Sequence, residues 1–337
     1  MDILKKIYNK DFYKNKSILI TGGTGTLGNV LVDFFLNETD CNRICIFSRD
    51  EFKQHNMKIK FKNNVNKSKL RFFIGNIRDL NRITYATTDI DIVFHAAALK
   101  QVDAIEYNPV EGIKTNILGT QNVIDACIKQ NVSNLIGIST DKCVSPVNLY
   151  GATKLCLEKI IIAAYPFSGR KLKTCVLRYG NVIGSRGSVI PKFKEQINNG
   201  EFTVTNKKMT RFTLTINEAK NFILNCVPMS YGGEIFVPKL YKYTLPQICK
   251  LINPKNKINE IGIRPGEKLH EEMISKAESL NVWESDNFFV IESILAKLNS
   301  QLISKLNLKK NSKLFNYTSE DAEIIPDNDL LKQINLK

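Results

Sequence analysis

One segment sets the architecture expected for the whole chain: Ser17-Ile18-Leu19-Ile20-Thr21-Gly22-Gly23-Thr24-Gly25-Thr26-Leu27-Gly28. Its first five residues are typical of a buried strand, and a GxGxxG pattern follows before an amphipathic segment. The first glycine of that pattern, Gly23, allows a tight turn, the second lets backbone approach a pyrophosphate, and the third lets a helix pack on the strand. The pattern predicts a dinucleotide site. Its expected contacts are Gly22, Gly23, Thr24, Gly25, Thr26, Leu27 and Gly28.

The rest of the first half alternates β-branched runs with amphipathic segments, which is typical of repeated βαβ units. Further strands are expected at 43–47, 70–74, 92–95, 134–139 and 174–179, and helices at 27–36, 51–61, 110–129 and 150–165. This order predicts an α/β fold with a Rossmann-type doubly wound parallel sheet. A Gly- and Ser-rich turn at 184–188 breaks the rhythm. We therefore expect a dinucleotide-binding domain over 1–180 and a smaller C-terminal substrate-binding lobe over 181–337, whose elements can interleave with the first domain.

Composition narrows the class of protein. The 337 residues carry 48 Lys and Arg against 33 Asp and Glu, a net charge of +15, with acids interleaved among the bases. This scatter favours a solvated basic surface over nucleic-acid binding, and an anionic small substrate is compatible with it. No apolar run approaches the roughly 20 residues that span a bilayer, and no export signal is visible, so a soluble, cytoplasmic protein is expected. The 8 Cys and 3 His form no metal-ligand pattern, so no metal site is predicted.

The end of the second strand bears on the choice of cofactor. Ser48 and Arg49 stand where an acid would hold the ribose hydroxyls of NAD. An acid there would repel a 2′-phosphate, whereas serine and arginine would accept one, so NADP is favoured over NAD. NAD remains a possible cofactor because of Asp50: a shift of two residues in the turn would place this acid beside the ribose.

A second motif follows a strand that ends in Ser139-Thr140. Tyr150 and Lys154 form YxxxK, which places both side chains on one face of a helix. A nearby ammonium lowers a phenol pKa, so the tyrosine can act as a base on a sugar hydroxyl while the lysine holds the nicotinamide ribose. Such a pair arises by chance, but this one lies at the sheet edge where ligands collect.

Together these features resemble the extended short-chain dehydrogenase/reductase family. The run Ser139-Thr140-Asp141-Lys142-Cys143-Val144-Ser145-Pro146-Val147-Asn148-Leu149-Tyr150-Gly151-Ala152-Thr153-Lys154 is similar to the signature of its inverting UDP-N-acetylglucosamine 4,6-dehydratases, which open the pseudaminic acid pathway. Further similar blocks lie at 48–51, 95–100, 106–109, 178–182, 209–212 and 263–271.

The resemblance implies the reaction and its residues. Tyr150 would take the carbon 4 hydroxyl proton, with Thr140 hydrogen-bonded to that hydroxyl, as hydride leaves for the nicotinamide. Lys142 would remove the carbon 5 proton if desolvation lowers its pKa, and a protonated Asp141 would protonate the departing carbon 6 hydroxyl. The hydride would return to carbon 6. The product is UDP-2-acetamido-2,6-dideoxy-beta-L-arabino-hex-4-ulose.

The resemblance also implies contacts to both ligands. For the cofactor these are Ser48, Arg49, Asn76, Ile77, Ala96, Ala97, Lys100, Tyr150 and Lys154. For the UDP-sugar they are Lys100, Asn181, Arg211 and Arg264. Asn76 departs from the aspartate common in the family, and Asn206 and Thr213 also depart near the uridine site. His95 is expected to be a packed residue near the cofactor and not a catalyst.

Other functions remain open at this point. An epimerase or a retaining 4,6-dehydratase of the same superfamily would share the fold, although an epimerase needs no adjacent acid and amine, and retaining relatives usually carry methionine at position 150 and membrane spans. A catalytically silent NADP-sensing module would not need Thr140, Tyr150 and Lys154 together. Relatives form dimers or hexamers, so a homo-oligomer is expected. The downstream pathway and further epimerisation at carbon 3 are left undecided.

Overall fold

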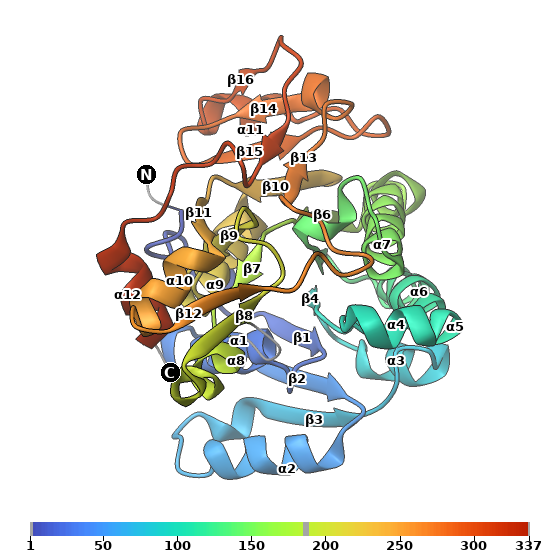
Figure 1. Cartoon of the computed structure of the whole chain (residues 1–337). Helices are drawn as coiled ribbons and strands as arrows, with labels where there is room; N and C mark the ends of the chain where they lie inside the picture. Colours follow the sequence, from blue (N-terminus) through green and yellow to red (C-terminus); the bar gives the residue numbers. More distant parts are fainter. Residues whose placement is uncertain (1–2, 185–188, 336–337) are drawn as a thin grey trace.

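The computed structural model describes residues 3–184 and 189–335, so the expected turn at 184–188 lies, apart from Gly184, outside the described residues. At its centre six strands form a parallel sheet in the order β3-β2-β1-β4-β5-β6 (Figure 1). They are β1 (Ser17–Thr21), β2 (Arg43–Ser48), β3 (Leu70–Ile74), β4 (Ile92–His95), β5 (Asn134–Ile138) and β6 (Lys173–Leu177). The predicted Rossmann-type sheet is confirmed, with strand ends close to those expected from the apolar runs.

The sheet continues beyond β6 with strands from the second half of the chain. β10 (Glu234–Pro238) adds in parallel to β6, and β15 (Phe288–Ile291), β14 (Val282–Glu284) and β16 (Lys309–Lys310) add antiparallel beyond it. The sheet is therefore mixed and larger than the six strands predicted. The boundary between residues 180 and 181 stays a proposal, and several elements that follow it lie on the first sheet.

Helices cover both faces of the sheet, as the βαβ rhythm requires. On one face α3 (Leu80–Ala86), α6 (Gly119–Lys129) and α7 (Leu149–Phe167) pack side by side, and on the other α1 (Thr26–Glu38) packs against α9 (Ile216–Cys226) (Figure 1). The remaining helix of this half that was predicted is α2 (Glu51–Lys60). Within the described ranges, no helix has the length and apolar character that crossing a membrane requires.

The helix predicted over 110–129 is interrupted. It consists of α5 (Pro109–Ile113), a π-helical turn at Lys114–Leu118 and α6, preceded by the short α4 (Val102–Tyr107). The π turn places the buried Asn116 where its Oδ1 accepts from Leu99 N at 2.8 Å and its Nδ2 donates to Leu99 O at 2.9 Å and Thr153 Oγ1 at 3.0 Å. Such turns recur at functional sites. Here the turn fixes the loop that carries Lys100 against α7.

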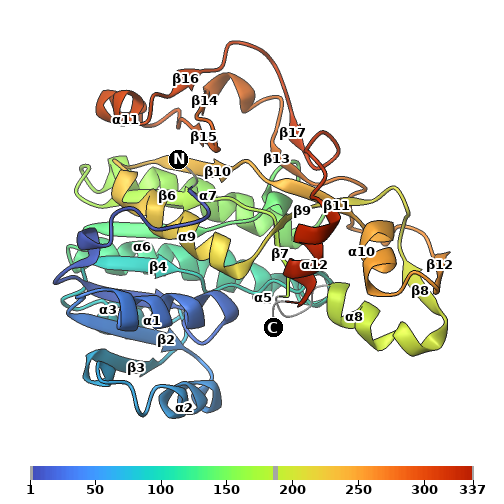
Figure 2. The same ribbon diagram turned by 90° about the vertical axis from the view of Figure 1, so that its left-hand side faces the viewer.

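A second, smaller core forms beside the carboxyl ends of the main strands (Figure 2). It is built from small sheets, β11-β9-β7 and β12-β8, and from helices that pack around them, with Phe193, Phe202 and Ile248 fully buried. These elements are β7 (Asn181–Val182), α8 (Val189–Glu195), β8 (Glu201–Val204), β9 (Thr210–Leu214), β11 (Tyr241–Thr244), α10 (Leu245–Ile252), β12 (Lys257–Glu260) and α12 (Asp327–Asn335). β13 (Glu272–Ile274) pairs with β17 (Tyr317–Thr318), and α11 (Ser300–Lys305) follows β15.

Candidate active site

A cavity of about 1010 Å³ lies where the carboxyl ends of the parallel strands meet the second core. Every residue predicted for cofactor, substrate or catalysis lines it except Gly23 and Asp141. The predicted residues in its wall are Gly22, Thr24, Gly25, Thr26, Leu27, Gly28, Ser48, Arg49, Asn76, Ile77, Ala96, Ala97, Lys100, Thr140, Lys142, Tyr150, Lys154, Asn181, Arg211 and Arg264. Neither Asn206 nor Thr213, the two departures near the uridine site, is in this wall.

The glycine loop shapes one end of the cavity. Gly22 has φ +67°, a left-handed conformation that favours glycine, and a Cβ there would lie 2.9 Å from the backbone of Ala97. A Cβ on Gly28 would lie 2.2 Å from the carbonyl oxygen of Gly23, so α1 packs tightly on the turn. The tight turn expected at Gly23 is therefore made by Gly22, and Gly23 packs against Ile46 instead of facing the cavity. The start of α1 opens into this end, where its unpaired amides suit a pyrophosphate.

The residues after β2 divide into a cavity group and a capping group. Ser48 and Arg49 line the cavity. Asp50 also reaches it, but its carboxylate caps α2, accepting from Lys53 N at 2.9 Å and pairing with Lys53 Nζ at 2.7 Å. Asp50, the acid that could bind the ribose hydroxyls of NAD, is thus engaged as the N-cap of α2. Beside it, Asn76 accepts from Arg78 N at 3.1 Å through Oδ1.

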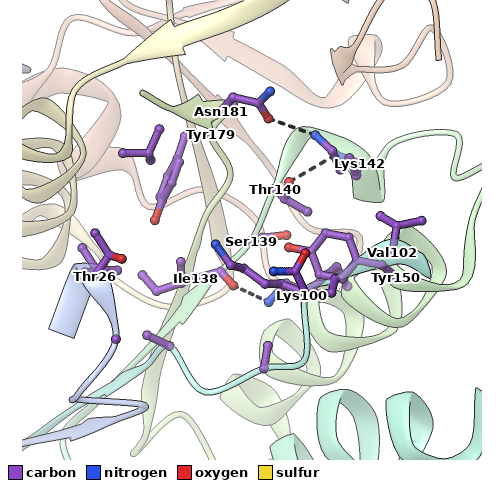
Figure 3. Close-up of a pocket in the computed structure, with 18 of the residues that line it drawn as sticks. Thr26, Lys100, Val102, Ile138, Ser139, Thr140, Lys142, Tyr150, Tyr179 and Asn181 are labelled. Atoms are coloured by element: carbon purple, nitrogen blue, oxygen red, sulfur yellow. Dashed lines mark hydrogen bonds between the residues drawn. The ribbon is translucent and has the colours of Figure 1, made fainter. Parts of the chain in front are cut away.

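The predicted catalytic residues gather at the other end, with Thr26 across from them (Figure 3). Thr140 caps the 3₁₀ turn η4 (Asp141–Cys143), and its hydroxyl donates to Asp141 Oδ1 at 3.0 Å. Tyr150 and Lys154 come from the first turns of α7, which Asn148 caps. Lys154 Nζ donates to the carbonyl oxygen of Ile138, at the end of β5.

Lys142 is held by three acceptors. Its Nζ lies 3.0 Å from Asp141 Oδ1, 3.0 Å from Asn181 Oδ1 and 3.1 Å from Glu271 Oε1, and Figure 3 shows the contact with Asn181. An ammonium has three N–H donors, so all of them are engaged. Burial acts to lower the pKa of Lys142, but the carboxylates of Asp141 and Glu271 outweigh it and raise the pKa above its ordinary value. The expectation that desolvation lowers this pKa is therefore wrong.

Asp141 lies behind the cavity wall. Its side chain is fully buried and its Oδ2 has no hydrogen-bond partner among the described residues. Burial raises the pKa of Asp141, Lys142 opposes this, and Glu271 adds to it; the net direction is upward. The carboxyl therefore retains a proton more readily than an exposed aspartate, but it has no surface of its own on the cavity.

The YxxxK pair differs from expectation in its electrostatics. Burial raises the pKa of Tyr150 to about 12, and the ammonium that opposes burial is that of Lys142. Burial lowers the pKa of Lys154 to about 8. His95 is buried between Thr21 and Thr120, at 2.8 and 2.9 Å, and burial with the Lys154 charge lowers its pKa to about 3. His95 is a packed, neutral ring, as predicted.

The two arginines predicted for the UDP group have different surroundings. Arg211 is nearly buried, and its guanidinium donates to the carbonyl oxygens of Thr210, Leu269 and Lys268 at 2.7 to 3.1 Å. Arg264 is 58% exposed and pairs with Glu267 Oε1 at 2.6 Å. Arg264 can therefore exchange its partner for a phosphate at small cost, whereas Arg211 has most of its donors occupied within the protein.

Glu271 contacts Lys142 at the cavity wall, although no role was predicted for it. It falls within the block at 263–271, but nothing in its spacing connects it with Lys142.

No group of three or more His, Cys, Asp or Glu side chains in residues 3–184 and 189–335 is placed to hold a metal ion.

Comparisons with known proteins show the family to which the chain belongs. A family model described as polysaccharide biosynthesis protein matches residues 18–293. The chain is 43% identical over 317 residues to a Campylobacter jejuni protein named UDP-N-acetylglucosamine 4,6-dehydratase (inverting), covering 92% of this chain and 94% of that protein. It is also 41% identical over 320 residues to a Rickettsia bellii protein named UDP-glucose 4-epimerase, covering 92% and 93%.

Two solved structures extend the comparison. The structure of Pen from Bacillus thuringiensis has a TM-score of 0.86 at 38% identity and covers 96% of this chain and 98% of that one. A dTDP-glucose 4,6-dehydratase from Streptomyces venezuelae, solved with NAD and TYD bound, has a TM-score of 0.68 at 16% identity, covering 94% and 95%, and shows a shared fold alone. That structure holds NAD, and in this chain a glycine loop shapes one end of the cavity.

Proposed function

This chain belongs to the polysaccharide biosynthesis protein family, within the extended short-chain dehydrogenase/reductase fold, and from that premise we propose that it is an NADP-dependent, inverting UDP-N-acetylglucosamine 4,6-dehydratase. Its membership and its relatives identify it as an enzyme that modifies a nucleotide sugar. The choice of reaction rests on the residues of the cavity.

One observation carries the proposal: an amine in the cavity wall beside a tyrosine is in hydrogen-bond contact with an acid directly behind it. Asp141 Oδ1 and Lys142 Nζ are 3.0 Å apart, and Lys142 and Tyr150 line the same cavity. Dehydration of a hexose needs a base at carbon 5 and an acid at carbon 6 in addition to the base at carbon 4. An epimerase needs only the last of these.

The choice of NADP rests on the residues after β2. Arg49 is an exposed cation in the cavity wall, and Asp50 is engaged in capping α2. A planar guanidinium suits a 2′-phosphate, and the acid that follows Arg49, Asp50, is hydrogen-bonded to Lys53 at the start of α2. Bound NADP would supply an acceptor for hydride from carbon 4 and a donor to carbon 6. Gly22 and the start of α1 would hold its pyrophosphate.

The chain's own groups would then move the protons. Tyr150 Oη would accept the carbon 4 hydroxyl proton in its ionised form, which the Lys142 ammonium favours and burial opposes, and Thr140 Oγ1 would hold that hydroxyl in place. A shift of one proton from Lys142 Nζ to Asp141 Oδ1, across 3.0 Å, gives a neutral amine and a neutral acid. The amine can take the carbon 5 proton. Because Asp141 has no cavity surface, its proton would reach the carbon 6 hydroxyl through Thr140 or Lys142, both of which contact Asp141 Oδ1.

The epimerase alternative has one observation in its favour, the 41% identity to a protein named UDP-glucose 4-epimerase. An epimerase would use Thr140, Tyr150 and Lys154 and leave Asp141 and Lys142 as a structural pair. The identities of 43% and 41% hardly separate the two reactions. The identity of the reaction product must therefore decide between a dehydratase and an epimerase.

The test is incubation of the purified protein and NADP with UDP-N-acetylglucosamine, followed by proton NMR of the nucleotide sugar. We expect a 6-deoxy-4-keto product and no net reduction of the cofactor. Formation of UDP-N-acetylgalactosamine alone would identify an epimerase. Unchanged substrate, from protein shown to bind NADP, would favour a non-catalytic cofactor-binding module.

We also propose that the enzyme is a homo-oligomer, a dimer or a hexamer. Several large apolar side chains on the helices α4 to α7 are exposed, among them Tyr107 at 89% and Phe167 at 80%. Exposed apolar side chains in number favour association between copies. Light scattering coupled to size-exclusion chromatography would give the state, and a monomer at micromolar concentration would contradict this proposal.

A further inference from the structure

Glu271 stands at the wall of the cavity without a role in the scheme above. It is 3% exposed, and its Oε1 lies 3.1 Å from Lys142 Nζ and 3.5 Å from Arg211 Nε. Its backbone is fixed by Ser319, which accepts from Glu271 N at 2.9 Å and donates its own N–H to Glu271 O at 2.7 Å. The carboxylate is therefore held firmly against Lys142, from a part of the chain far from it in sequence.

The second oxygen of Glu271 distinguishes it from a structural carboxylate. Its Oε2 is buried and has no hydrogen-bond partner among the described residues. Leaving a buried acceptor unsatisfied costs about 1–3 kcal/mol, more when it is charged. The position of this carboxylate is therefore set on one side only, by the charges of Lys142 and Arg211 that its Oε1 faces.

We propose that Glu271 is a positioning residue of the dehydration: it holds the Lys142 amine at the cavity wall and keeps a negative charge beside the Asp141–Lys142 pair. This inference rests on the proposed function, because it assigns Glu271 to a step in which Lys142 is the base.

The contacts of Lys142 show what Glu271 adds. Once Lys142 has given one proton to Asp141, its neutral amine keeps two N–H donors for three neighbours. Asn181 Oδ1 and the newly protonated Asp141 are neutral, so the ionised Glu271 is the strongest acceptor that remains. Glu271 therefore keeps the Lys142 nitrogen at the cavity wall while that nitrogen accepts the carbon 5 proton.

The charge of Glu271 also acts on its neighbours. Burial works to raise the pKa of Glu271, but Lys142, Arg211 and Lys268 outweigh it, so Glu271 stays ionised. That negative charge raises the pKa of both Asp141 and Lys142. The other titratable groups that face these charges are Arg211 on β9, Tyr150 on α7 and Tyr243 on β11. Removal of the charge should therefore lower the pKa of the acid and of the amine together.

The test compares the pH dependence of kcat and kcat/KM for three proteins: wild type, Glu271→Gln and Glu272→Gln. Glu271→Gln keeps the shape of the side chain and removes its charge. Glu272→Gln makes the same change one residue away, where the carboxylate accepts from Ser145 Oγ and does not touch Lys142.

We expect both limbs of the Glu271→Gln profile to move to lower pH by about 1 unit or more. Its kcat should fall by about 10²-fold because the amine is misplaced, while KM changes little. The Glu272→Gln profile should superimpose on that of the wild type. A Glu271→Gln profile that also superimposes would overturn the proposal.

A second variant covers a failure of Glu271→Gln to fold. Glu271→Asp keeps the charge but withdraws it from Lys142, so its kcat should fall while its profile moves to lower pH by less than about 1 unit. A wild-type kcat would overturn the proposal. The wild-type protein distinguishes a failure of the proposed function from a failure of the role of Glu271. If the wild type does not turn over UDP-N-acetylglucosamine, the proposed function is contradicted. If the wild type does so and the Glu271 variants have the same kcat and pH profile, only the role of Glu271 is contradicted.

Discussion

Two clusters of buried charge flank the turn η4 and are built from similar side chains. The closed cluster comprises Arg178, Glu158 and Glu278: Arg178 contacts Glu158 Oε2 at 2.6 Å and Glu278 Oε1 at 2.9 Å, and donates to Met273 O at 2.8 Å. The open cluster comprises Asp141, Lys142, Arg211 and Glu271, joined at 3.0 to 3.5 Å.

The clusters differ in how completely their atoms are satisfied. Among the residues that the structure describes, every buried side-chain N or O atom of the closed cluster has a hydrogen-bond partner, whereas Asp141 Oδ2 and Glu271 Oε2 of the open cluster have none. Lys142, Arg211 and Glu271 also line the cavity, and no member of the closed cluster does. Buried carboxylates without partners destabilise a fold, so their presence beside a cavity indicates chemistry, while full satisfaction away from it indicates structure.

The largest effect is expected from Lys142→Met in the open cluster. Loss of the base should lower kcat by about 10²- to 10⁴-fold, while carbon 4 oxidation can still occur, so reduced cofactor should accumulate. Its absorbance during a single turnover would report this. Because Asp141 takes up a proton readily and Glu271 retains Arg211, the variant should remain folded. Wild-type turnover would remove Lys142 from the mechanism and with it the contrast between the clusters.

The closed cluster should show the reverse. Arg178→Met leaves two buried carboxylates without their cation and should lower the free energy of unfolding by about 3–5 kcal/mol, with KM of the folded fraction unchanged. Urea unfolding followed by circular dichroism measures this. Lys239→Met serves as the control, because it breaks an exposed pair with Glu284 and should cost less than about 1 kcal/mol. An Arg178 variant as stable as this control would show that the closed cluster does not stabilise the fold.

One carboxyl group of each cluster, Glu278 and Asp141, should make the stability of the fold respond to pH with opposite sign. Burial acts to raise the pKa of Glu278, but Arg178 outweighs it and holds the pKa below the ordinary 4.5, so its stabilisation is present above pH 4.5 and is lost as the pH falls further. The pKa of Asp141 lies above the ordinary 3.8, so its favourable contribution is lost as the pH rises through the folded value.

Two isosteric variants would reveal this difference. Glu278→Gln should cost about 1–3 kcal/mol of unfolding free energy at pH 7 and less near pH 4. Asp141→Asn should gain stability relative to the wild type as the pH rises from 4 to 8. Thermal unfolding across this range measures both, and slopes of the same sign would remove the electrostatic distinction between the clusters.

The smallest effect concerns a cation outside both clusters. Arg49→Ala should weaken NADP binding about tenfold and leave NAD binding nearly unchanged, because only the 2′-phosphate needs the guanidinium. Fluorescence titration with the two cofactors gives both Kd values. Equal losses for the two would show that Arg49 does not read the 2′-phosphate.

The sequence predicts the first six strands well because each is a short apolar run between turn signals, as at 17–21 and 92–95. β10 and the antiparallel strands beyond it were not assigned to the sheet, because their partners lie far away along the chain. The π turn around Asn116 was also missed. Its sequence continues a helical pattern, and only the contact with Leu99 reveals the interruption.

In the site, too, contacts between residues near in sequence could be predicted, and contacts between residues far apart in sequence could not. Thr140, Lys142, Tyr150 and Lys154 lie within fifteen residues, so a strand end and one helix turn bring them together, and the sequence predicts their meeting. Glu271 reaches Lys142 only through the loop before β13. The sequence-based direction of the Lys142 pKa was wrong because it weighed burial alone, whereas the charges of Asp141 and of this second carboxylate together outweigh burial.

The most direct test of the open cluster as the acid–base site is turnover of UDP-N-acetylglucosamine in heavy water, with the product examined by proton NMR and mass spectrometry. We predict a 4-keto-6-deoxy sugar that carries one deuterium at carbon 5 and has the L-arabino configuration. A product with protium at carbon 5, or with the D-configuration retained there, would contradict the assignment.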